Sequence, residues 1–424
     1  MQKSKRITRF YYGWYMAVTL AITETISWGI VYYAFTVFLT PMQHDLGWSR
    51  SELTGGFSLA LLISGGLAFP VGTWIDRHGS RALMTVGSIL ASLLIVAWSQ
   101  VTDLRMFYLI WAGLGVCAAA VLYEPAFAVM ATWFVRRRST ALAVITFAAG
   151  LASTIFIPLS DALLNAFGWR QAILILGIVL AVTTIPLHAL MLRRHPDDLG
   201  LLPDGEIKQH YDVPLQPKGL SLSDALHSRF FWVLVVTFSL ASFAAGAVRV
   251  HFIPLLIDSG INASTAALAS GSIGLMQVMG RLLFAPADAR VSGRIKLASI
   301  FALQAAAMVV LLTGASLGAV VIFVVVFGAS YGAQTLARAS IIAELFGATH
   351  YGRISSVMSV FLTVAGTAAP VTAAALYDYF GTYQPVLILT VVLAVIATTI
   401  MAWAKPDIKK RTILSTQEFQ HGHI

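Results

Sequence analysis

Long apolar runs with almost no charge are the feature that most constrains this chain. Apolar residues make up 58% of its 424 residues and charged residues only 11%, whereas an ordinary soluble domain is about 25% charged. A soluble fold of this size needs more charge to cover its surface, and disorder needs low hydrophobicity. A transmembrane helix takes about 20 apolar residues. The sequence therefore predicts an all-α integral membrane protein.

Twelve apolar runs are long enough to cross a bilayer. In chain order they cover residues 13–39, 52–75, 82–100, 105–133, 140–165, 169–192, 229–256, 262–287, 295–315, 317–346, 352–376 and 382–404. A polar segment separates the first six runs from the last six. We therefore predict four regions: an N-terminal six-helix bundle (1–192), a cytoplasmic linker (193–228), a C-terminal six-helix bundle (229–404) and a cytoplasmic tail (405–424).

The positions of the basic residues predict the topology. With the N-terminus in the cytoplasm, 22 of the 28 Lys and Arg residues fall in inner segments. The outer loops hold three, Arg50, Arg105 and Arg170. This bias follows the positive-inside rule, so we expect a multi-pass protein of the inner (plasma) membrane with both termini in the cytoplasm. The net charge of +9 is explained by these loops, and binding to nucleic acid is not expected.

Three loop landmarks recur at one offset between the two halves. The segment 45–47 (Asp-Leu-Gly) is matched by 258–260 (Asp-Ser-Gly), and 167–168 (Phe-Gly) by 380–381, both at an offset of 213. Asp76 is matched by Asp288 at an offset of 212. Two copies of a six-helix unit are therefore predicted, a plan in which a substrate is held between the repeats near the bilayer midplane.

A loop motif follows the second apolar run and reads Gly-Thr-Trp-Ile-Asp-Arg-His-Gly-Ser-Arg over residues 72–81. Its glycines permit a tight turn. The loop resembles the signature of the major facilitator superfamily, G-x-x-x-D-R-x-G-x-R. That resemblance implies the major facilitator fold of two six-helix bundles. It also implies a gating role for Gly72, Asp76, Arg77, Gly79 and Arg81, and for Asp288 in a degraded second copy.

A second motif narrows the resemblance to one branch. Residues 133–138 read Trp-Phe-Val-Arg-Arg-Arg and lead into a helix rich in small residues, as far as Gly150. This pattern resembles the signature of monocarboxylate porters. The resemblance implies a secondary transporter of small organic monocarboxylate anions such as lactate or pyruvate, which moves them with a proton by alternating access.

Arg281, in the eighth run, is the candidate contact for the substrate. A charge at mid-membrane costs about 3 kcal/mol on insertion scales, and a guanidinium can hold a carboxylate with two parallel hydrogen bonds. The resemblance implies this role, because monocarboxylate porters bind the substrate carboxylate with an Arg of this span. The alternative is a structural ion pair with an intramembrane acid.

Five further residues are candidates for the site. Tyr123 and Tyr331 lie in Gly/Ala-rich stretches, and the resemblance places both phenols against the substrate. His251 titrates near neutral pH and is a candidate both for the substrate and for the coupled proton. Glu24 and Glu124 are the other proton candidates, because an ionised carboxylate is expensive in hydrocarbon unless it serves a function or has a partner.

The chain departs from the animal porters in ways that bear on its substrate. Gln277 stands one turn before Arg281, where those porters have an acid, and neither the first nor the eleventh run contains a Lys. One fixed cation suits a monoanion better than a dianion. Arg249 lies two residues before His251, so on a helix it points elsewhere. We expect Arg249 at the membrane boundary, in contact with headgroups.

Other kinds of transporter remain as alternatives, whereas functions other than transport are not expected. An organic-anion exchanger and a porter of neutral solutes or drugs are the alternatives. A membrane enzyme is not expected, because the motif H-E-x-x-H and the P-loop are absent from the sequence. The single cysteine, Cys117, cannot form an intrachain disulfide, and no metal site or cofactor is predicted. The expected partners are a small organic anion, a proton and the lipid bilayer, around a monomer.

Overall fold

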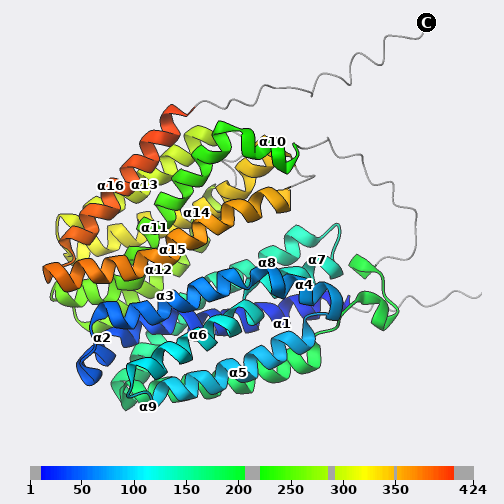
Figure 1. Ribbon diagram of the computed structural model, residues 1–424, viewed down its shortest axis with the longest axis horizontal. Coiled ribbons are helices and arrows are strands. Elements are labelled where there is room, and N and C mark those ends of the chain that lie inside the picture. Colours follow the sequence, from blue (N-terminus) through cyan, green and yellow to red (C-terminus); the bar gives the residue numbers. More distant parts are fainter. Residues whose placement is uncertain (1–10, 206–219, 285–291, 348–350, 405–424) are drawn as a thin grey trace, which may run out of the picture.

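The computed structural model describes residues 11–205, 220–284, 292–347 and 351–404, and in these ranges every regular element is helical (Figure 1). The N-terminal elements are α1 (Tyr12–Ser27), the π-helix η1 (Trp28–Tyr33), α2 (Ala34–Leu46), α3 (Arg50–Gly66), α4 (Ala68–His78), α5 (Arg81–Ser99), α6 (Leu104–Val121), α7 (Tyr123–Trp133), α8 (Arg138–Gly150) and α9 (Ala152–Met191). Three short elements follow, η2 (Pro196–Leu199), η3 (Pro203–Gly205) and α10 (Leu222–His227). The C-terminal elements are α11 (Arg229–Asp258), α12 (Ala263–Phe284), α13 (Gly293–Leu312), α14 (Leu317–Phe346), α15 (Tyr351–Phe380) and α16 (Gln384–Trp403).

The helices make the expected number of membrane crossings. In the described part of the chain, ten helical segments are long and apolar enough to span a bilayer, and the bent pair α3 and α4 adds an eleventh. One of the ten, Arg138–Met191, has 54 residues. At 1.5 Å per residue it would be about 80 Å long, against a hydrocarbon core of about 30 Å. It is broken at Gly168, where φ is 77°, so it forms two spans and brings the total in the described ranges to twelve.

Several spans are broken within the bundle, and the sequence places proline next to two of the breaks. Span 2 breaks at Leu67, between α3 and α4, and span 4 breaks at Leu122, between α6 and α7. Pro70 and Pro125 each occupy the third position of the helix that follows. Backbone N–H groups of a first helical turn have no partner within the helix, so proline costs little there.

The predicted internal repeat is visible in the helix ends. Gly47 and Gly260 follow α2 and α11 with φ of 69° and 88°, and Gly168 and Gly381 have φ of 77° and 68°. A positive φ is accessible to glycine without a steric cost. Each pair of glycines therefore shares a positive φ at the predicted offset of 213 residues. The third landmark pair is not comparable, because Asp288 lies outside the described residues.

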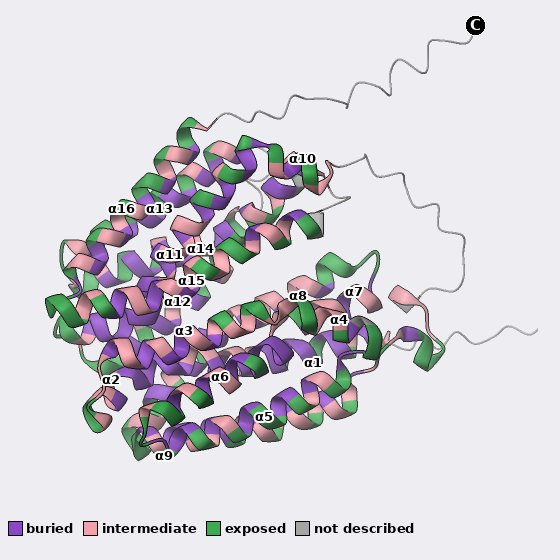
Figure 2. Ribbon diagram, in the orientation of Figure 1, coloured by how far each residue is buried: buried purple, intermediate pink, exposed green. Residues whose placement is uncertain are grey.

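Each bundle has its own packed interior. In the N-terminal bundle Phe35 stacks on Phe57 at 4.6 Å, and Trp98 meets Trp111 edge-on at 5.0 Å. In the C-terminal bundle Phe323 stacks on Phe327 at 4.8 Å. Figure 2 shows exposed residues in green along the outer helix faces. Exposed apolar residues include Leu93, Val182 and Val321. An outer surface of this kind suits a hydrocarbon solvent.

The two bundles touch mainly at one end. We call this the Arg50 end, and the opposite end, where residues 192–205 lie, the linker end. The extensive contacts between bundles join α3 to α15 and the first half of α9 to α12. In the described ranges, the extensive contacts of α4 and α7, at the linker end, are with N-terminal elements and η3 alone. The bundles are therefore closed together at the Arg50 end.

Candidate functional site

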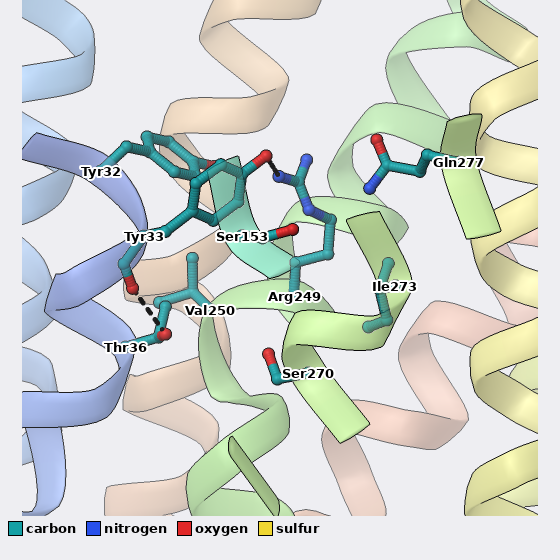
Figure 3. Close-up of a pocket in the computed structure, with 9 residues that line it drawn as sticks. All are labelled: Tyr32, Tyr33, Thr36, Ser153, Arg249, Val250, Ser270, Ile273 and Gln277. Carbon is teal, nitrogen blue, oxygen red and sulfur yellow. Dashed lines mark hydrogen bonds between the residues drawn. The ribbon is translucent and has the colours of Figure 1, made fainter. Parts of the chain in front are cut away.

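A small polar cavity lies between the bundles (Figure 3). Its volume is about 20 Å3, room for about one water molecule. Lining residues come from both bundles and are Tyr32, Tyr33, Thr36, Ser153, Arg249, Val250, Ser270, Ile273 and Gln277. A carboxylic acid of three carbons needs more room than this, so the cavity must widen to admit one.

Arg249 is the cation of this cavity, which corrects the expectation that it lies at the membrane boundary. Its Nη1 donates to the Tyr331 hydroxyl at 2.9 Å and its Nη2 to the Tyr33 hydroxyl at 3.0 Å. Its guanidinium also lies 4.9 Å from the centre of the Tyr331 ring. Figure 3 shows the side chain extending between Tyr33 and Gln277. Because Tyr33 belongs to the N-terminal bundle and Tyr331 to the C-terminal one, Arg249 joins the two bundles.

A π-helix positions the tyrosines of the N-terminal bundle. The first span winds as α-helix to Ser27, as π-helix over Trp28–Tyr33 and again as α-helix from Ala34. Tyr32 and Tyr33, at the end of the π segment, both line the cavity. Consecutive residues of an α-helix lie about 100° apart, and a local π turn changes which of them face inward. Such turns are frequent at functional sites.

Arg281 projects from α12 toward the N-terminal bundle. Its Nη1 donates to the Thr146 carbonyl of α8 at 3.0 Å. Its Nε is buried and has no hydrogen-bond partner. Described carboxylates form no ion pair with Arg281, so the alternative of a structural ion pair finds no support in this part of the chain. Arg281 therefore has donors available for a ligand.

Glu24 is a fully buried acid near the same region. Its Oε2 accepts from the Trp28 indole at 3.1 Å, and its Oε1 has no donor. Tyr123 packs on Trp28 at 5.1 Å and interacts electrostatically with both Glu24 and Arg281. These three predicted residues are therefore near one another. Glu124, the other acid, is exposed on the first turn of α7.

His251 lies apart from these residues, at the Arg50 end. Its Nδ1 is 2.9 Å from the Tyr383 hydroxyl, and its Nε2 is 2.9 Å from the Pro370 carbonyl. The carbonyl can only accept, so Nε2 carries the hydrogen and Nδ1 accepts from Tyr383. Both ring nitrogens are thus occupied. The roles predicted for His251 stay predictions, and its geometry favours a structural one.

A charged network closes the Arg50 end across the bundle boundary. Arg50 donates from Nη1 and Nη2 to the two carboxylate oxygens of Asp258, at 2.9 and 3.0 Å. Its Nη1 also donates to the Tyr383 hydroxyl at 2.7 Å, and its guanidinium lies 3.8 Å from the Tyr377 ring centre. We call Arg50, Asp258, Tyr377, Tyr383 and His251 the Arg50 cluster.

The predicted signature loop lies at the linker end. Gly79 ends α4 with φ of 79° and forms the turn into α5, whereas Gly72 lies inside α4. Arg81 donates from Nε to the Ala189 carbonyl at 2.7 Å, and the Arg77 carbonyl accepts from Arg194. The loop therefore holds the linker end of the N-terminal bundle together. The Asp76 side chain lies outside the described part, as does all of Asp288.

A comparison with protein families decides the class of this chain. The model of the Major Facilitator Superfamily matches residues 20–286 and 252–421. The chain belongs to the Major Facilitator Superfamily. Its curated relatives are transporters rather than enzymes, and the predicted fold is confirmed. Three or more His, Cys, Asp or Glu side chains arranged to hold a metal ion are not found in the described ranges.

Sequence relatives of this superfamily member include monocarboxylate transporters. Monocarboxylate transporter 11 of Homo sapiens is 30% identical over 281 residues, which cover 64% of this chain and 56% of the relative. An uncharacterized MFS-type transporter of Bacillus subtilis (strain 168), YcxA, is 26% identical over 253 residues, 59% of each chain. Both alignments span less than two thirds of the relative. Monocarboxylate transporter 4 of Rattus norvegicus is 24% identical over 371 residues, 84% of this chain and 75% of the relative.

Solved structures share the fold over nearly the whole chain. A bacterial homolog of the human lysosomal transporter Spinster superposes with a TM-score of 0.70 at 16% identity, covering 94% of this chain and 97% of the other. A mutant of the nucleoside transporter NupG gives 0.72 at 10% identity, covering 92% and 100%. These likenesses establish the architecture in which the cavity lies.

Sequence reasoning missed two features of this superfamily member. The sequence analysis places Arg249 at the membrane boundary, although an ionisable residue inside a span is by default a functional candidate, and this rule identifies it. Arg50 is predicted only as an outer-loop charge. Its partner Asp258 is 208 residues away, and sequence spacing carries no information on such a contact.

Proposed function

We propose that this chain is a secondary active transporter of small organic monocarboxylate anions, of the size of lactate or pyruvate, moved with a proton by alternating access. The observation that carries the proposal is the state of Arg281. A permanent charge inside the bundle is bound to one backbone carbonyl and keeps a buried Nε without a partner, among the residues the structure describes. The relatives named monocarboxylate transporters support the same class.

In the proposed orientation the linker end faces the cytoplasm. The inner segments then carry most of the basic residues, as the positive-inside rule requires. Both termini lie in the cytoplasm of a cell with this protein in its inner (plasma) membrane. Residues 193–228 are then a cytoplasmic linker and residues 405–424 a cytoplasmic tail.

Substrate binding in this scheme begins at Arg281. A carboxylate takes two parallel hydrogen bonds from a guanidinium, and the unpartnered Nε of Arg281 with a neighbouring Nη offers that arrangement. The Tyr123 phenol lies near enough to Arg281 to interact with it electrostatically. Tyr123 also presents both a hydroxyl and an apolar ring to a ligand. The aromatic wall suits the short carbon chain of the acid.

Glu24 is the proposed carrier of the proton. Its Oε1 has no donor, so it can take up a proton without breaking an existing bond. Both nitrogens of His251 are already occupied. Glu24 also lies close enough to Tyr123 to interact with it electrostatically. Proton and anion sites are therefore adjacent.

The transport cycle follows from which end is closed. The Arg50 cluster joins the bundles on the proposed outer side, so the described state opens inward. Rocking of the bundles around the central site then exposes it to the outside. A lone anion entering an inside-negative cell opposes about 2.3 kcal/mol per 100 mV. A proton that moves with the anion removes this electrical cost.

Anion exchange is the second candidate. Gln277 stands one turn before Arg281, and an amide cannot carry a proton, which favours exchange. Exchange of one monoanion for another also moves no net charge. Transport of a neutral solute or drug is disfavoured, because it leaves the charge of Arg281 without a counter-ion.

The test is uptake into proteoliposomes. Labelled lactate is supplied with and without an inward proton gradient, and short carboxylates compete with their uncharged amides. We expect a gradient to accelerate uptake, the acids to compete and the amides not to. Arg281→Gln should abolish uptake, whereas Arg105→Gln, on an exposed residue, should not. Undiminished uptake by Arg281→Gln, or equal competition by the amides, would exclude the proposal.

A further inference from the structure

Arg249, Tyr33 and Tyr331 form a cluster made of hydrogen-bond donors, which we call the Arg249 triad. A guanidinium has five N–H donors and no acceptor. Two of these donors reach the phenol oxygens of Tyr33 and Tyr331. In the described structure neither phenol has an acceptor for its own hydrogen. Three N–H and two O–H donors therefore remain for a ligand.

The triad also holds a charge without a counter-ion. Arg249 is permanently protonated, and the described carboxylates form no ion pair with it. Its neighbours in the cavity are neutral: tyrosines, a threonine, serines, a glutamine and apolar residues. Intramembrane charges normally have a partner or serve a substrate path. A cluster of donors around an unmatched cation is complementary to an oxyanion.

Arg281 and the triad open toward the same region. Arg249 shares its cavity with Gln277 of α12. Arg281 follows Gln277 by four residues on that helix, and residues four apart lie on one helix face. Helices α11 and α12 pack against each other in the C-terminal bundle. In the described ranges this region therefore holds two guanidiniums, where the sequence predicts a single fixed cation.

We propose that the Arg249 triad is a second anion-binding subsite, so that small dicarboxylates bind to this transporter more tightly than monocarboxylates. One carboxylate lies on Arg281 and the other on the triad. A dianion matches two guanidiniums, whereas a monoanion leaves one unmatched. The inference rests on the proposed carboxylate transport and adds a specificity-determining residue to it. Tyr33 also makes the N-terminal bundle a part of this subsite.

The test compares acids that differ only in the second carboxylate. Succinate and butyrate, each with four carbons, compete with labelled lactate for uptake into proteoliposomes at pH 7.5. A hydrogen bond to a charged group contributes about 1.5–3 kcal/mol, so we expect succinate to inhibit at a concentration about tenfold or more below that of butyrate. Arg249→Gln should reduce this ratio to near one. Arg105→Gln is the matched control and should keep the wild-type ratio.

A second set of variants guards against misfolding of Arg249→Gln. Tyr33→Phe and Tyr331→Phe remove one donor each and keep the ring, and they should lower the succinate preference together more than singly. Equal inhibition by succinate and butyrate in the wild type would overturn the inference and leave carboxylate transport standing. An unchanged preference in both Arg249→Gln and the double phenylalanine variant would do the same. Failure of every acid to compete would instead refute the proposed function.

Discussion

Arg50 and Asp258 form a two-point ion pair between the bundles, with the guanidinium bound to both carboxylate oxygens. The Arg50 side chain is 5% exposed and that of Asp258 30%. Arg50 belongs to α3 and Asp258 to the end of α11. The pair therefore exists only while this end of the molecule is closed, and it has to break whenever the bundles part there.

Charge reversal at this pair should open the Arg50 end. Arg50→Asp places two acids face to face, and loss of a partly buried charge pair costs about 2 kcal/mol, or about 30-fold in the ratio of closed to open states. The readout is the labelling of Thr36→Cys, a cavity residue, by an impermeant maleimide in the Cys117→Ala background. We expect faster labelling from the outside in Arg50→Asp.

The swapped pair is the control for charge reversal. Arg50→Asp combined with Asp258→Arg restores opposite charges and should return labelling toward the wild-type rate. Both variants lack the hydrogen bond from Arg50 to Tyr383, so we expect the swapped pair to recover only part of the wild-type behaviour. If Arg50→Asp is labelled as slowly as the wild-type sequence at position 50, the ion pair does not hold this end closed.

A crosslink beside the pair should stop transport. The Ser51 backbone N–H donates to the Asp378 carboxylate at 2.9 Å, from one bundle to the other. Ser51→Cys with Asp378→Cys, in the Cys117→Ala background, should form a disulfide under oxidation. Uptake should cease on oxidation and return on reduction, because the end can no longer open. Full transport by a quantitatively crosslinked protein would contradict alternating access at this end.

The sequence predicts the framework better than the interior. Charge bias and apolar length predict the spans, and the paired glycine turns at Gly47 and Gly260 follow from the repeat. The side of α11 on which Arg249 lies could not be predicted, because this helix is buried on nearly all sides. A helix that is apolar all round has no polar face from which to read its orientation. The π-helix over Trp28–Tyr33 has no recognised sequence pattern either.

Close packing between bundles depends on Gly274. A Cβ added there would lie 2.8 Å from the Gly150 carbonyl oxygen and would also meet Ser153. Gly274→Val should therefore push α12 away from α8 and α9. Overpacking costs about 1–3 kcal/mol, which should appear as a lower temperature of unfolding in detergent. Gly318→Ala, where an added Cβ meets nothing within 4 Å, should leave that temperature unchanged or raise it.

Glu24→Gln should separate proton coupling from substrate binding. The amide oxygen can still accept from the Trp28 indole, but an amide cannot carry a proton through the cycle. We expect a proton gradient to stop accelerating lactate uptake while exchange of lactate for lactate continues. Both rates are measured in the same proteoliposomes, with and without internal lactate.

Glu124→Gln discriminates between the two acids. Glu124 is exposed on α7, so its amide variant should keep the response to the proton gradient. If Glu124→Gln loses the acceleration of uptake by the proton gradient and Glu24→Gln keeps it, Glu124 rather than Glu24 carries the coupled proton. A response kept in both variants, with exchange intact, would indicate that neither acid carries the proton. If the wild type exchanges lactate but its uptake does not respond to the proton gradient, anion exchange is favoured. Arg281 then binds its anion without a coupled proton.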